Sequence, residues 1–110
     1  MTYTLETISE IMRSEAILSP QTIGEMRRWL AGNYCYIAGL LEEVLLRKTD
    51  SWLVIRKNTQ SDTSAEKEWS ATAEGKQELI YRSQLKRSEK LMSALKTLYE
   101  IKEREAMNIF

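Results

Sequence analysis

The chain has 110 residues, with 16 Lys and Arg, 16 Asp and Glu, no His and one Cys, so its formal net charge is zero. This length fits one domain, and a hydrophobic share of 43% with four Gly and one Pro argues against a disordered or loop-rich chain. Without histidine a Ser-His-Asp triad and the usual zinc sites are excluded. We therefore expect a protein without enzymatic activity, bound metal or cofactor.

The first predicted element is a short helix over residues 4–18. Its apolar residues recur at spacings of three and four, as on one face of an amphipathic helix. They are Leu5, Ile8, Met12 and Ala16. Pro20 ends the pattern, because the residue before a proline avoids helical backbone angles. Ser19 is then the predicted N-cap of the next helix, with Pro20 as its first residue.

The second predicted element is a long helix over residues 20–57. Apolar residues follow one face of it at steps of three, four or seven, which is typical of a coiled coil. They are Ile23, Met26, Leu30, Ile37, Leu41, Val44, Trp52 and Ile55, with Lys48 in the same register. Residues 51–55 also have strand propensity, but the helix is favoured there because the register continues.

Small residues share another face of this helix, since Gly32, Cys35 and Gly39 are three and four positions apart. A glycine inside a helix costs about 1 kcal/mol relative to alanine, so two on one face indicate close packing of another helix. That helix belongs either to the same chain or to a second one. The alternative is that the glycines relieve crowding around Tyr34 and Tyr36. We expect Cys35 to be packed and unreactive, because no cation lies beside it in the sequence.

The third and last long element follows a polar segment. Residues 58–64 are all polar and form the predicted turn. A helix is predicted over residues 64–107, with a capping box of Thr63 and Glu66 at its start and a bend or break near Gly75. Its main apolar face contains Tyr81, Leu85, Met92, Leu95 and Tyr99.

Together these elements predict an all-α fold, with one helical domain over residues 1–110. We expect a long, coiled-coil-like antiparallel hairpin with a short helix before it. Two helices bury little core, so we also expect a homo-oligomer. The predicted interface consists of Gly32, Cys35, Gly39, Leu85, Met92, Leu95 and Tyr99. No apolar run has the length of a membrane span and no signal-peptide pattern is present, which predicts a soluble, cytoplasmic protein without membrane contacts.

Basic residues gather in two places despite the zero net charge. The candidate DNA-binding residues are Arg47, Lys48, Arg56 and Lys57, around Trp52, and Arg82, Lys86 and Lys90 further along. Such tracks suit phosphate binding, and a tryptophan among them suits stacking on an unpaired base. The alternative for the second track is an ordinary solvated face, because Glu78, Glu89 and Glu100 lie on or beside it. The alternative for Trp52 is packing in the core or in an interface.

The second half of the sequence resembles a family of small phage proteins. The segments that carry the resemblance are WSATAEGKQEL (69–79), LMSALK (91–96) and IKEREA (101–106). They look like helical proteins encoded near phage recombination genes, and are similar to the C-terminal half of the UvsY recombination mediators of T-even phages. The resemblance covers about the last 50 residues and consists of a long helix, a polar turn and a second helix with a Leu/Ala-rich seam.

The resemblance implies an oligomer without enzymatic activity that binds single-stranded DNA. It also implies partners, because such mediators help a recombinase load against a single-strand-binding protein. Basic residues near the end of the first long helix bind DNA in that family, and the matching positions here are Arg56 and Lys57, with Arg47 and Lys48 one or two turns earlier.

Two other functions also fit the sequence. One is a helical adaptor or inhibitor of a host protein that binds no DNA and docks a partner helix on the face of Gly32 and Gly39. The other is a purely structural oligomer. Loss of DNA binding on substituting Arg56 or Lys57 would favour the mediator over both.

Overall fold

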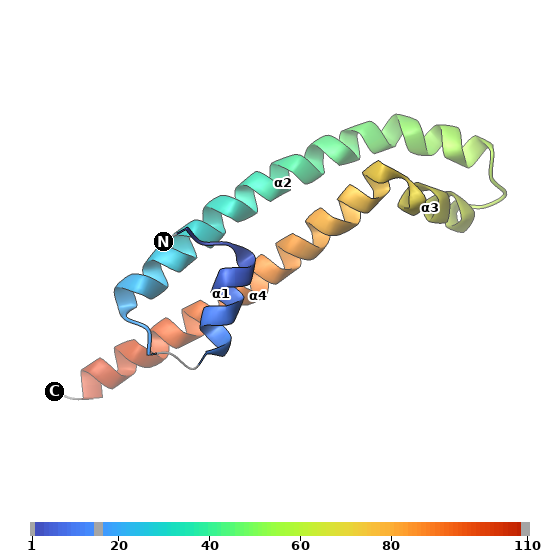
Figure 1. Cartoon of the computed structure of the whole chain (residues 1–110). Coiled ribbons are helices and arrows are strands. Elements are labelled where there is room, and N and C mark those ends of the chain that lie inside the picture. The colour runs from blue at the N-terminus through green and yellow to red at the C-terminus, as the bar shows by residue number, and fades with distance from the viewer. Residues whose placement is uncertain (1, 15–16, 109–110) are drawn as a thin grey trace. The chain divides into compact units, whose positions relative to one another are not determined.

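The computed structural model describes residues 2–14 and 17–108, and all regular structure in these ranges is helical. Figure 1 shows the helices in chain order: α1 (Leu5–Arg13), α2 (Pro20–Lys57), α3 (Asp62–Ala71) and α4 (Ala73–Asn108). The predicted all-α class is confirmed. No helix of the described residues is both long and apolar enough to cross a bilayer.

The chain divides into two compact units. The terminal unit combines Met1–Cys35 with Lys86–Phe110, and the middle unit is Tyr36–Leu85. Helices α2 and α4 each contribute one part to either unit. The terminal unit also contains α1, and the middle unit also contains α3.

Helix α1 is bounded by hydroxyl side chains at both ends. The Thr4 hydroxyl accepts a hydrogen bond from the backbone N–H of Thr7 at 3.0 Å, and the Thr7 hydroxyl accepts one from the backbone N–H of Thr4 at 2.7 Å. At the other end, both the N–H and the hydroxyl of Ser14 donate to the carbonyl of Ile11. These bonds end the helix at Arg13, earlier than the predicted residue 18.

The core of the terminal unit joins α1 to parts of α2 and α4. Its buried side chains are Ile8, Leu18, Ile23, Met26, Leu30 and Leu95. Arg87 of α4 holds α1 in place, because it pairs with Glu6 at 2.7 Å and donates to the hydroxyl of Ser9 at 2.9 Å. Of the apolar face predicted for the first helix, Leu5, Ile8 and Met12 belong to this core, while Ala16 lies outside the described residues.

Helix α2 begins as the sequence predicts. The Ser19 hydroxyl accepts from the N–H of Thr22 at 3.1 Å, and the Ser19 carbonyl accepts from the N–H of Ile23 at 3.1 Å. The helix is continuous through residues 51–55, so the helical interpretation of that segment is confirmed. The predicted apolar face is buried from Ile23 to Val44 and half-buried beyond it.

Helix α3 begins earlier than predicted. The N-cap is Ser61, whose hydroxyl accepts from the N–H of Ser64 at 3.1 Å, and the first helical residue is Asp62. The predicted capping box of Thr63 and Glu66 is therefore wrong, because an earlier hydroxyl takes that role.

The single helix predicted over residues 64–107 is divided in two at Thr72. This residue has an extended backbone, with φ −74° and ψ 160°, and separates α3 from α4. The break lies just before Gly75, where the sequence indicates a bend. It allows α3 to pack in the middle unit, whose buried apolar residues are Ile37, Leu41, Val44, Ala65 and Trp69.

Candidate nucleic-acid interface

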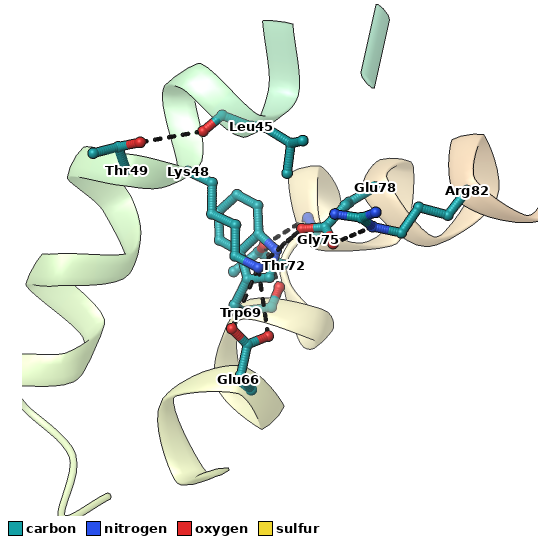
Figure 2. A network of polar contacts seen from close by, with 9 residues as sticks. All are labelled: Leu45, Lys48, Thr49, Glu66, Trp69, Thr72, Gly75, Glu78 and Arg82. Carbon is teal, nitrogen blue, oxygen red and sulfur yellow. Dashed lines mark hydrogen bonds and ion pairs between the residues drawn. The ribbon is translucent and has the colours of Figure 1, made fainter. Parts of the chain in front are cut away.

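The corner between α3 and α4 is fixed by Thr72. Its hydroxyl donates to the carbonyl of Trp69 at 2.6 Å and accepts from the N–H of Gly75 at 3.0 Å (Figure 2). Gly75 is buried against the same carbonyl, and a Cβ there would overlap the Trp69 carbonyl oxygen. Any larger residue must move the backbone, so this corner requires glycine.

Lys48 reaches the same corner from α2. Its Nζ lies 3.1 Å from Oε1 of Glu78, 3.3 Å from Oε1 of Glu66 and 5.5 Å from the centroid of the Trp69 ring. The indole Nε1 of Trp69 donates to Oε1 of Glu78 at 3.0 Å, and Nε of Arg82 lies 2.9 Å from Oε2 (Figure 2). We call these five residues the Lys48–Glu78 network.

Glu78 is the centre of this network. Burial raises the pKa of its carboxyl, but hydrogen bonds from Arg82, Lys48 and Trp69 act in the opposite direction and leave the pKa below its ordinary value. The carboxylate is therefore ionised at neutral pH and forms ion pairs with both Lys48 and Arg82. Lys48 and Arg82, both candidates for DNA binding, are thus engaged within the fold.

Two more candidate residues have acidic partners. Nε of Arg47 lies 3.4 Å from Oε1 of Glu74. Nε of Arg56 lies 2.6 Å from Oδ1 of Asp62, and its Nη1 donates to the carbonyl of Thr59 at 3.1 Å. The other candidates, Lys57, Lys86 and Lys90, are exposed and have no ion pair within the described residues. Four of the seven candidates are thus engaged in ion pairs within the described residues.

Trp52 is half-buried, and its indole Nε1 is buried without a hydrogen-bond partner among the described residues. It lines a depression of about 280 Å³ together with Leu45, Thr49 and Leu53. This position favours packing over stacking on a base.

The predicted oligomer interface divides into exposed and buried residues. Gly32, Cys35 and Gly39 are exposed, and no described atom lies within 4 Å of a Cβ built on either glycine. The expectation that Cys35 is packed is therefore wrong, because α2 turns this face to solvent. By contrast, Leu95 is fully buried in the terminal unit. Three further interface candidates are half-buried: Leu85, Met92 and Tyr99.

The terminal unit contains a basic groove that the charge pattern of the sequence does not reveal. It has a volume of about 550 Å³ and lies between α2 and α4. Its lining residues are Gly24, Arg27, Arg28 and Ala31 of α2 and Glu89, Met92, Ser93 and Lys96 of α4. Small residues leave the space: no described atom lies within 4 Å of a Cβ placed on Gly24, and Ala31 and Ser93 are exposed.

Three cations line the basic groove against one carboxylate. Within the described part of the chain, none of Arg27, Arg28 and Lys96 forms an ion pair. The carboxylate is Glu89, which accepts a hydrogen bond from the Tyr34 hydroxyl at 2.9 Å. That hydrogen bond, together with the charge of Glu89, raises the pKa of Tyr34. The groove therefore carries net positive charge in a concave surface.

The basic groove contains side chains of kinds that can contact nucleotides. Guanidinium and ammonium groups bind phosphate, and exposed apolar surface can contact a base. Met92 supplies a half-buried apolar lining, and the guanidinium carbon of Arg27 lies 6.0 Å from the centroid of the Tyr99 ring. One sequence signal could have found this site. It is the Arg27-Arg28 pair with a small residue about one helical turn to either side, Gly24 before it and Ala31 after it.

Comparison with protein-family models, curated proteins and solved structures finds no match for this chain. The assignment of a function therefore depends on the geometry of the chain itself.

Proposed function

We propose that the protein is a non-enzymatic accessory factor that binds single-stranded DNA as an oligomer and assists recombinase loading. The observation that carries this proposal is the basic groove, which Arg27, Arg28 and Lys96 line without a described acidic partner. The recombination role rests on the resemblance of residues 69–106 to phage mediators.

Single-stranded DNA is favoured over a duplex because the groove is concave and partly apolar. Splayed bases can stack or pack against side chains, while a duplex presents mainly phosphates to a surface of this kind. A neutral chain attracts DNA weakly at long range. Several copies aligned along one strand would supply the missing charge through their combined binding.

The proposed assembly unit is an antiparallel pair of helices. Two contacts in the terminal unit support this arrangement, because Arg27 lies near Tyr99 while the later residue Tyr34 contacts the earlier residue Glu89. The two helices therefore run in opposite directions in this unit.

The proposed contact with another copy uses exposed apolar residues of α4. Leu79 and Ile80 are 69% and 52% exposed, and suit such a contact. Sedimentation velocity tests this: a single monomer species over a wide concentration range would contradict the oligomer.

The DNA-binding proposal is tested by fluorescence anisotropy of a labelled single-stranded oligonucleotide at several salt concentrations. We expect salt-sensitive binding, weakened about tenfold by Arg28→Gln combined with Lys96→Gln, because each removes a phosphate contact. Arg56→Gln is the matched control, since that guanidinium already pairs with Asp62. Loss of affinity in Arg56→Gln but not in the groove variant would place the DNA-binding site at the end of α2 instead of in the groove. Absence of binding at low salt would refute the function.

A further inference from the structure

A second surface lies on α2 within the middle unit, and we call it the apolar row. It consists of Gly39, Leu46 and Leu53, which follow one another at intervals of seven residues. Seven residues make two helical turns less about 20°, so the three positions share one face over about 21 Å. Leu46 is 68% exposed and Leu53 51% exposed, and Gly39 has no neighbouring atom within 4 Å of its Cβ position.

Neighbouring residues extend the apolar row on both sides. Tyr36 and Val54 are 65% and 60% exposed and lie along one edge. Near the other edge, Leu53 also lines the depression of about 280 Å³ that contains Leu45 and Trp52. The result is an apolar helix face with a shallow hollow at one end, which is the form of surface that receives the ridge of another helix.

The charges that border the apolar row are mainly acidic. Glu42, Glu43 and Asp50 are exposed, and no described cation forms an ion pair with any of them. The cations nearest to them in sequence, Arg47 and Lys48, already pair with carboxylates of α3 and α4. A helix docked between Gly39 and Leu53 would therefore meet negative charge along its flanks, while the exposed Lys57 lies on the same face one turn beyond Leu53.

This charge pattern disfavours a second copy of the same face. In a parallel, in-register arrangement the equivalent carboxylates of the two copies would lie at the same height along the paired helices. In an antiparallel arrangement centred on Leu46, Glu42 and Glu43 would oppose Asp50. Flanking positions of paired helices select partners by charge, and like charges are repelled. DNA is excluded by the same negative charge.

We propose that the apolar row binds a basic amphipathic helix of another protein, with its apolar residues on Leu46 and Leu53 and its Lys or Arg residues on Glu42, Glu43 and Asp50. Apolar contact supplies the affinity, and the flanking charges select the basic partner. This site does not depend on the DNA-binding proposal, because it uses different residues in a different unit.

The test uses two synthetic amphipathic helices of about 21 residues, enough to span the row at 1.5 Å per residue. Both carry leucine at heptad positions, one with lysine and the other with glutamate on the flanks. Anisotropy of the labelled peptides is measured against the full chain. We expect the lysine peptide to bind at least about tenfold more tightly than the glutamate peptide.

Variants of the chain then locate the site. Leu46→Glu should weaken the lysine peptide about tenfold, whereas Ile101→Glu, at an exposed apolar residue of α4 in the terminal unit, should not. A triple variant with Glu42→Lys, Glu43→Lys and Asp50→Lys should reverse the preference and select the glutamate peptide. Circular dichroism confirms that each variant remains helical.

Three results would overturn the proposal. Equal binding of the two peptides would show that charge does not select the partner. Equal effects of Leu46→Glu and Ile101→Glu would place the peptide elsewhere. Self-association of the wild-type chain that Leu46→Glu abolishes would show that a second copy occupies the row.

Discussion

Two groups of basic residues, one in each unit, are used in opposite ways. In the middle unit, Lys48 and Arg82 contact carboxylates and help to hold three helices together. In the terminal unit, Arg27 and Arg28 line a groove and have no ion pair within the described residues. A basic pair in a sequence therefore does not by itself indicate a ligand site. Whether a basic pair is free to bind a ligand depends on whether the fold places a carboxylate beside it.

The largest effect is expected from Gly75→Ala in the middle unit. The added methyl group would meet the Trp69 carbonyl carbon and oxygen, so the corner that positions Glu78 must shift. We expect a loss of about 3 kcal/mol in the free energy of unfolding, in the range of severe backbone and packing changes. Urea unfolding followed by circular dichroism measures it. An unchanged midpoint would mean that the corner does not hold the network.

The next effect tests the network directly through Glu78→Gln. The amide keeps the size but loses the charge that Lys48 and Arg82 contact, so we expect a loss of about 2 kcal/mol. Glu89→Gln in the terminal unit is the matched control. Its carboxylate is exposed and contacts no described cation within ion-pair distance, so its loss should cost less than about 0.5 kcal/mol. Equal losses of unfolding free energy in both variants would show that Glu78 contributes no more to stability than the exposed Glu89.

Acid should weaken the same network. The pKa of Glu78 is lower in the folded chain than its ordinary value of 4.5, so its contribution to stability is complete above that value. The contribution is lost as the pH falls through the lowered folded pKa. The difference in melting temperature between the wild type and Glu78→Gln should therefore shrink toward low pH. A difference that stays constant down to that pKa would show that the carboxylate charge is not what stabilises the unit.

The smallest effect is expected from Gly39→Ala, which has the opposite sign to Gly75→Ala. Gly39 is helical and exposed, and open space surrounds its Cβ position. Alanine should raise the free energy of unfolding by about 0.5–1 kcal/mol, because it restricts the unfolded chain and favours the helix. Destabilisation instead would reveal a close neighbour of this face, as in an oligomer.

Much of the helical structure could be predicted from the sequence, because it depends on local patterns. The Ser19 cap, the start at Pro20 and the apolar face from Ile23 to Val44 follow from capping and periodicity. The sequence indicates a break near Gly75, but not its cause. Glycine is required there by the Trp69 carbonyl, and this contact exists only once α3 and α4 have formed.

The candidate site could be predicted less well, because its electrostatics depend on residues distant in sequence. The partners of Lys48 come from residues 18 and 30 positions further along, on α3 and α4. The basic groove likewise requires Lys96 beside Arg27 and Arg28. A charge count along one helix finds the cations, but the groups that neutralise or accompany them depend on how the helices pack.

The Thr72 hydroxyl acts at two helix ends at once. It donates to a terminal carbonyl of α3 and accepts from an N–H in the first turn of α4. Since a single residue joins the two helices, the corner contains no stretch of chain that could bend without breaking one of these bonds. The Thr72 side chain therefore couples the last turn of α3 to the first turn of α4 and helps to set the angle between them.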